Sequence, residues 1–145
     1  MAVRRLKLLD AEIVEREEGG YEAAVKLRFQ EQNFVGTTQF TENTQQQQIE
    51  AIAKATVEAL KEALPIAVDI YLRKAVKMTP AFLTDNLIVV MVDMYVELRR
   101  LELTGCCVCV DKDLHYGIAR ATLDSTNRIV DYLLAKQNLK PRTEH

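Results

Sequence analysis

The chain has 145 residues, of which 48% are hydrophobic and 28% charged, a composition typical of one soluble domain. Nineteen basic against 21 acidic residues give a formal net charge of -2, which argues against the broad basic surface of a nucleic-acid-binding protein. No apolar run is long enough to span a membrane, and the N-terminal run is too short for a secretory signal. We therefore predict no nucleic-acid partner and no membrane partner.

The first half of the chain predicts three strands followed by a helix. Apolar and polar residues alternate in the middle strand, as they do in strands with one buried face. Thr44 can cap the first turn of the helix while Gln47 reaches back, and Pro65 ends the helix. The predicted strands are Leu6–Glu15, Tyr21–Gln30 and Phe34–Thr41, with turns at residues 17–20 and 31–33.

The second half repeats this order. Asp113 can cap a second helix that runs to about Gln137, and residues 138–145 are expected to be a frayed polar tail. Residues 66–78 also fit a helical pattern, although the order of the first half favours a strand. The predicted strands are Ile66–Met78, Leu87–Val96 and Leu101–Val110.

The two halves are related in sequence. The segment IAKATVEAL at Ile52–Leu60 parallels IARATLDST at Ile118–Thr126, and Gly36 parallels Gly105. We therefore predict a single α+β domain of two tandem βββα repeats, at about residues 3–64 and 66–137, related by a pseudo-twofold axis. The simplest arrangement is a six-stranded sheet with both helices on one face. Each helix carries a ridge of small residues that could pack against the other, namely Ala51, Ala55 and Ala59, and Gly117, Ala121 and Ser125.

The duplicated unit resembles a known regulatory domain. Its helical segment is Ala121-Thr122-Leu123-Asp124-Ser125-Thr126-Asn127-Arg128, and the pattern covers nearly the whole chain. It is similar to the regulatory domain of 2-isopropylmalate synthase and to stand-alone bacterial proteins carrying the segment ATLDALNR. The resemblance implies a dimerising module that binds a small regulatory ligand, as the synthase domain binds leucine. The catalytic barrel of the synthase family is absent, so we expect no enzymatic activity.

Three cysteines, Cys106, Cys107 and Cys109, lie in one predicted strand. Neighbouring side chains in a strand point to opposite faces, so only Cys107 and Cys109 share a face. Neither a Cys-x-x-Cys spacing nor a converging pair of histidines is present. We expect these thiols to act as small apolar side chains in the reducing cytoplasm, and we predict no metal and no cofactor.

The two halves differ on the strand faces that point away from the helices. The middle strand of the first half carries Glu22, Lys26 and Arg28 there. The corresponding strands of the second half are apolar, and soluble monomers rarely expose a large apolar patch. We therefore predict a homodimer through a twofold contact of this face. The predicted interface residues are Val89, Met91, Tyr95, Cys106, Val108 and Val110.

Asp93 is the one charge within that apolar strand. A carboxylate on an apolar face needs a partner or a raised pKa, and Arg73 on the preceding strand is a plausible partner. Asp69, Arg73, Asp93 and Tyr95 are therefore candidate ligand-binding residues. Two alternatives remain open, namely a small enzyme using Asp93, Tyr95 and Arg73 in an interface cleft, and a subunit of a hetero-complex.

Overall fold

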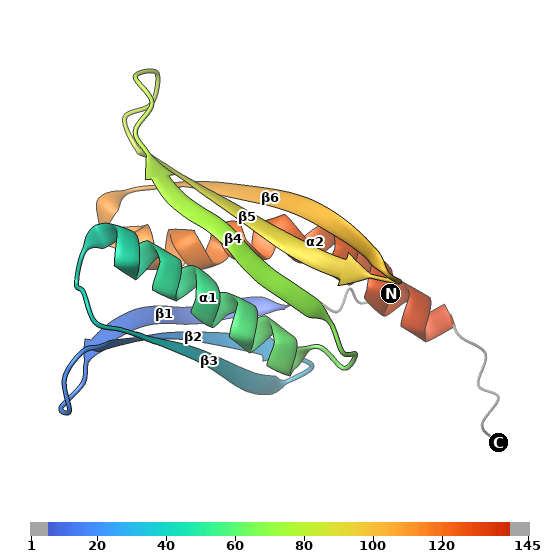
Figure 1. Cartoon of the computed structure of the whole chain (residues 1–145). Helices are drawn as coiled ribbons and strands as arrows, with labels where there is room; N and C mark the ends of the chain where they lie inside the picture. The colour runs from blue at the N-terminus through green and yellow to red at the C-terminus, as the bar shows by residue number, and fades with distance from the viewer. Residues whose placement is uncertain (1–5, 140–145) are drawn as a thin grey trace.

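The computed structural model describes residues 6–139, which form two successive βββα units (Figure 1). The first unit contains β1 (Lys7–Glu15), β2 (Tyr21–Phe29), β3 (Gln32–Phe40) and α1 (Gln45–Ala63). The second unit contains β4 (Asp69–Met78), β5 (Asn86–Val96), β6 (Arg99–Cys109), a 3-10 turn (Asp111–Asp113) and α2 (Leu114–Leu139). The predicted α+β fold with repeated βββα order is confirmed, and residues 69–78 form a strand. Of the predicted tail, residues 138 and 139 belong to α2, and residues 140–145 lie outside the described residues.

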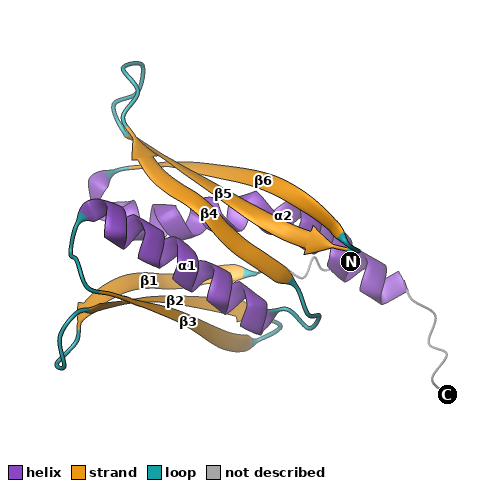
Figure 2. Cartoon of the chain, in the orientation of Figure 1, coloured by secondary structure: helices purple, strands orange, loops and turns teal. Residues whose placement is uncertain are grey.

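The strands form two separate sheets, so the predicted single six-stranded sheet is wrong. Each sheet is antiparallel, with the orders β1-β2-β3 and β4-β5-β6. The two helices lie between the sheets (Figure 2), which also corrects their predicted place on one face of a common sheet. Each helix packs on its own sheet and on the first strand of the other sheet, α1 on β4 and α2 on β1. Each sheet therefore has an inner face on the helices and an outer face.

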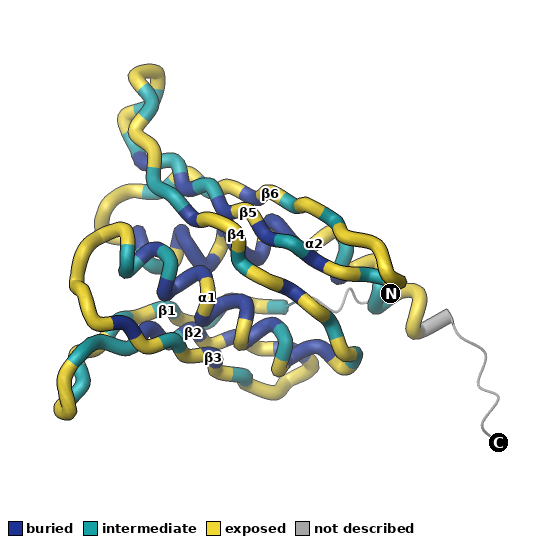
Figure 3. The backbone as a smooth tube through the Cα atoms, in the orientation of Figure 1, coloured by how far each residue is buried: buried dark blue, intermediate teal, exposed yellow. Residues whose placement is uncertain are grey.

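Helix α1 shows the physical reason for this correction. The apolar stripe of α1 is buried, and Ala51, Ala55, Val57 and Ala59 beside it are buried as well. The stripe comprises Ile49, Ile52, Ala53, Thr56 and Leu60. Figure 3 shows that α1 is buried over much of its length. Consecutive helical residues point in directions about 100° apart, so burial at positions 51–53 requires cover from more than one side. Periodicity indicates that a face is buried, and it does not indicate how many sheets cover it.

The small-residue ridges pack against strands. A β-carbon added to Gly36 would lie 2.1 Å from the carbonyl oxygen of Ala55. A β-carbon on Gly105 would lie 2.3 Å from the carbonyl oxygen of Ala121 and equally close to the nitrogen of Ser125. The third strand of each unit therefore meets the backbone of its own helix at the glycine. This contact replaces the ridge-to-ridge helix packing that the sequence predicted.

The same two glycines identify equivalent positions in the two units. Val25 pairs with Gly36, and Val90 pairs with Gly105. Four further pairs lead to the turn in the β2–β3 hairpin and six in the β5–β6 hairpin, so the second hairpin is longer by two pairs. Counting from the glycines, Lys26 of the first unit is equivalent to Met91 of the second.

Both hairpins close through two-residue turns. Gln30 and Glu31 have φ angles of 53° and 65°, and Glu97 and Leu98 have φ angles of 51° and 67°. Positive φ at both central positions defines the type I′ turn, whose twist matches that of the strands. The predicted turn at residues 31–33 is therefore misplaced, because β3 has already begun within it.

The helix starts were predicted with mixed success. The hydroxyl oxygen of Thr44 accepts a hydrogen bond from the backbone nitrogen of Gln47 at 3.2 Å, so the predicted cap of α1 is confirmed. Asp113 stands directly before α2 at Leu114, as predicted, and also ends the 3-10 turn, but within residues 6–139 its side chain makes no hydrogen bond to the helix. Within residues 6–139, neither helix is apolar enough over a sufficient length to cross a membrane.

Candidate functional site: the outer face of the second sheet

The outer face of the β4-β5-β6 sheet carries the side chains that the sequence singled out. Ile88, Val90, Val92 and Met94 of β5 are fully buried, so the residues alternating with them point outward, as predicted. Residues directly opposite one another on antiparallel strands share a face. The register of the sheet therefore also identifies the outward residues of β4 and β6.

One half of this face is apolar, and we call it the apolar end. Met91 is 36% exposed and Val108 is 51% exposed, while Lys74 lies opposite Met91 at the border. Val110 follows directly after β6 and is also exposed. The apolar end comprises Val76, Met78, Leu87, Val89, Met91, Cys106 and Val108.

A β-bulge in β4 adds residues to the apolar end that the sequence analysis missed. The pairing with β5 skips Arg73, between Leu72 and Lys74. The bulge reverses the alternation beyond it, so Ala75 is buried and Val76 points outward. Strand β1 has a bulge at the corresponding place, which further supports the duplication.

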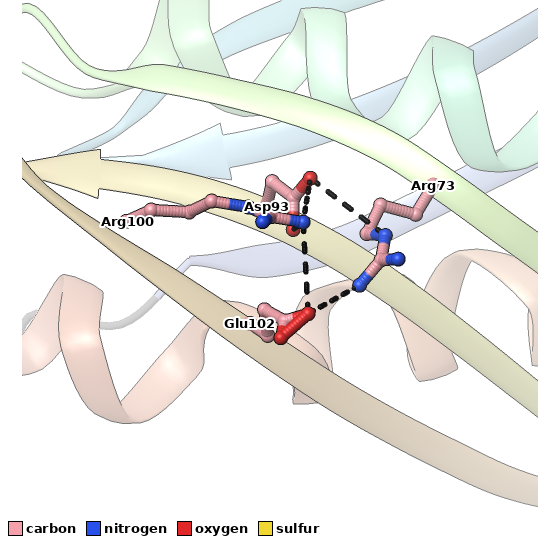
Figure 4. Close-up of polar contacts among 4 residues, drawn as sticks. All are labelled: Arg73, Asp93, Arg100 and Glu102. Atoms are coloured by element: carbon pink, nitrogen blue, oxygen red, sulfur yellow. Dashed lines mark hydrogen bonds and ion pairs between the residues drawn. The ribbon is translucent and has the colours of Figure 1, made fainter.

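The other half of the face carries a charged cluster, formed by Arg73, Asp93, Arg100 and Glu102 (Figure 4). Asp93 Oδ2 lies 3.7 Å from Arg73 Nε, which confirms the predicted pair. Arg100 Nη2 donates to both carboxylate oxygens of Asp93, at 3.3 and 3.2 Å. Glu102 Oε1 accepts from Arg73 Nη1 at 2.6 Å and lies 3.6 Å from Arg100 Nη2. The Asp93 side chain is 15% exposed, so its negative charge is offset by two guanidinium groups.

Arg100 was missed because the third strand was predicted to begin at Leu101. Glu102 lies within the predicted strand, but its place opposite Asp93 depends on a register that the sequence did not supply. Strand β6 begins at Arg99, and the two-residue turn before it places Glu102 directly opposite Asp93. A turn assigned at residues 97–98 would have placed Arg100 in the strand and Glu102 opposite Asp93. The hydrogen bond that Arg100 donates to Asp93, together with the attraction of the Asp93 charge, raises the pKa of Arg100.

The other two candidate ligand-binding residues lie beside this cluster. Asp69 pairs with Tyr95 across β4 and β5, and the Tyr95 ring meets the Tyr71 ring edge-on at a centroid distance of 6.0 Å. Lys61 Nζ of α1 lies 5.3 Å from the centroid of the Tyr71 ring. Among residues 6–139, no hydrogen bond or ion pair joins Asp69 or Tyr95 to the charged cluster. The four predicted residues therefore share one end of the face, and among residues 6–139 the only ion pair between them is that of Arg73 with Asp93.

The cysteines divide between the two faces of β6 as predicted. Cys106 is exposed, while Cys107 and Cys109 are partly buried. The Sγ atom of Cys109 lies so close to Gly117 that a β-carbon added to this glycine would be 2.5 Å from it. Burial raises the pKa of the Cys107 and Cys109 thiols. In the described part of the chain, no three potential metal ligands among His, Cys, Asp and Glu come together.

Two pockets lie near this sheet. One of about 690 Å³ lies between α2, the edge of β6 and the start of β1, where Asp124 Oδ2 accepts a hydrogen bond from the Cys106 backbone nitrogen at 3.1 Å. A second, of about 340 Å³, lies where β6 ends, and Val108, Val110 and Tyr116 line it. The candidate ligand-binding residues line neither pocket.

Comparisons with known proteins do not assign this face a role. No family model matches the sequence, and no curated protein matches it.

Proposed function

We propose that this protein is a non-catalytic module that forms a homodimer through the outer face of its β4-β5-β6 sheet. The observation that carries the proposal is the contrast between the apolar end and its counterpart in the first sheet. The equivalent outward residues there are Glu12, Val14, Glu22, Ala24, Lys26, Thr37 and Gln39. Soluble monomers rarely expose a contiguous apolar surface of this kind, and a second copy of the same face is the simplest cover.

The division of the face into two ends favours one orientation of the dimer. A twofold axis across the strands would set the charged cluster of one copy on the apolar end of the other, and it would take the ion pairs out of water against apolar side chains. An axis parallel to β5 places like ends together, so that β4 of one copy lies over β6 of the other. We infer that the axis runs parallel to β5.

The charged cluster is complementary to itself under this axis. Arg73 comes from β4 and Glu102 from β6. Because this axis sets β4 of one copy over β6 of the other, Arg73 of one copy would lie over the strand that carries Glu102 in the second copy. The cluster contains two arginines and two acids, and its formal charge is zero. Exchange of ion pairs between copies would fix the register of the contact with little repulsion.

Two further parts of the proposal concern ligand and compartment. A small polar regulatory ligand would bind at the charged end, beside Asp69 and Tyr95, and would appear as added mass on the native dimer in mass spectrometry. The resemblance to the dimerising regulatory domain of 2-isopropylmalate synthase agrees with such a role. We place the protein in the cytoplasm, because its three free thiols suit a reducing compartment.

The dimer is tested by charging the apolar end. Met91→Lys points a cation outward, which the folded monomer tolerates because Met91 is already 36% exposed. In a dimer the same cation would be buried among apolar groups. Light scattering at micromolar concentration should give the mass of a dimer for the unmodified protein, and monomers or aggregates for Met91→Lys.

The matched control is Lys26→Glu, at the equivalent position of the first sheet, and this variant should remain dimeric. A monodisperse monomer for the unmodified protein would overturn the proposal and favour the hetero-complex. A dimeric mass for Met91→Lys would also overturn it, because association would then use another surface. Far-UV circular dichroism verifies that both variants are folded.

A further inference from the structure

The loop between β4 and β5 extends the second sheet beyond the helices. It spans residues 79–85 and stands clear of the three layers at the top of Figure 1. Phe82 is 83% exposed and Met78, at the base of the loop, is also exposed. The corresponding loop of the first unit, between Glu15 and Tyr21, is Arg-Glu-Glu-Gly-Gly. A large aromatic side chain in water is thus peculiar to the second unit.

A pocket that could receive such a side chain lies beside β6, at the opposite edge of the same sheet. Besides the charged residues Asp85, Asp113 and Arg120, the lining of the pocket of about 340 Å³ at the end of β6 includes the apolar side chains of Val108 and Val110 and the ring of Tyr116. All three of these side chains are partly exposed. The pocket and the 79–85 loop lie at the same end of the sheet, because β4 ends and β5 begins where β6 ends.

The strand order connects the loop to the pocket across a dimer. In one copy the loop joins β4 to β5, and only its last residue, Asp85, reaches the pocket. The rest of the pocket lining comes from β6, α2 and the residues that join them. A twofold axis parallel to β5 exchanges these two sides and keeps the same end. The loop of one copy therefore passes over the β6 side of the other, near the pocket.

We infer that the 79–85 loop is a docking arm and that Phe82 of each copy fills the Val108–Val110–Tyr116 pocket of the partner. This inference rests on the proposed dimer and adds the element that locks it. Two such contacts form in each dimer, and truncation of the phenylalanine side chain removes the buried ring from both. Phe82→Ser should therefore raise the dissociation constant about tenfold or more.

The chain contains no tryptophan, so Phe82→Trp gives a single fluorescent reporter. If the arm docks, the indole emission of F82W should shift to the blue as concentration rises through the dimerisation range. It should return to that of a water-exposed indole when Met91→Lys is added. The control is Val35→Trp, on the outer face of the first sheet, whose emission should not depend on concentration.

The outcomes separate this inference from the proposed dimer. A dimeric F82W with the emission of an exposed indole at every concentration would overturn the docking arm and leave the dimer in place. An unchanged dissociation constant for Phe82→Ser would do the same. A monomeric unmodified protein would overturn both.

Discussion

The two sheets share one architecture and differ on their outer faces. Both have a bulge in the first strand, a type I′ turn after the second strand and a glycine in the third strand that touches its helix. Outside, Lys26 stands where the second unit has Met91, and Glu12 stands where it has Val76. The contacts that build the fold are thus present in both units, while the surface chemistry has diverged.

This difference shows where each kind of constraint acts. The inner faces of both sheets pack on helices, so both units need small or apolar residues there. Among residues 6–139 no helix or strand covers the outer faces, so their chemistry is explained by solvent or by another molecule. The duplication therefore provides an internal control, in which each experiment on the second unit has a counterpart in the first.

The largest expected loss of stability comes from disturbing the contact that both units share, between the glycine of the third strand and the helix. Gly36→Ala and Gly105→Ala each place a β-carbon within 2.3 Å of helix backbone atoms, which cannot move aside as a side chain can. Strand and helix must separate, and each variant should lose about 3 kcal/mol or more of unfolding free energy. Urea unfolding measures both values.

The control for the glycine variants is Thr37→Ala, next to Gly36 but exposed, which should change the free energy of unfolding by less than about 0.5 kcal/mol. A large loss for one glycine variant and a small loss for the other would break the equivalence of the two units. That result would mean that one strand–helix contact can relax.

A smaller effect is expected where the units differ in charge. Asp93→Asn removes the carboxylate that Arg73 and Arg100 share, whereas the equivalent residue of the first unit is the exposed Arg28. Because the two arginines remain partly exposed, the variant should lose on the order of 1 kcal/mol of unfolding free energy. Arg28→Gln should stay within about 0.5 kcal/mol.

Both charge variants are best measured by urea unfolding in the Met91→Lys background, where dimer formation does not contribute to stability. Equal losses from Asp93→Asn and Arg28→Gln would show that the charged cluster adds nothing to the folded unit. Its role would then lie wholly in association.

The smallest expected change concerns the rates at which the three cysteines are alkylated. Burial raises the pKa of Cys107 and Cys109, so fewer of these thiols are ionised at neutral pH than of ordinary cysteines. Iodoacetamide should therefore alkylate the exposed Cys106 first, and raising the pH should bring in the other two. Peptide mass spectrometry at short reaction times identifies the labelled site.

Alkylation also compares the outer face of the second sheet with that of the first sheet. Alkylation of Cys106 should slow as the protein concentration rises, because the dimer covers its face. Thr37→Cys places a thiol at the equivalent position of the first sheet, and its alkylation rate should not depend on concentration. If both thiols react at rates independent of concentration, the outer face of the second sheet remains open to water.

The sequence alone determined the duplicated βββα order and the inward and outward residues of β5. It also determined the pairing of Arg73 with Asp93. These features follow from local patterns, because a period of two or 3.6 residues fixes which side chains share a face. An isolated charge in an apolar strand likewise implies a nearby opposite charge.

Only the tertiary structure decided what each buried face packs against. Two sheets enclose the helices, and Gly36 and Gly105 each meet the backbone of the helix that follows their strand. A bulge at Arg73 and a type I′ turn at residues 97–98 determine which side chains join Asp93 on the outer face. Periodicity could not supply these contacts, because a one-residue shift in register moves every later side chain to the other face.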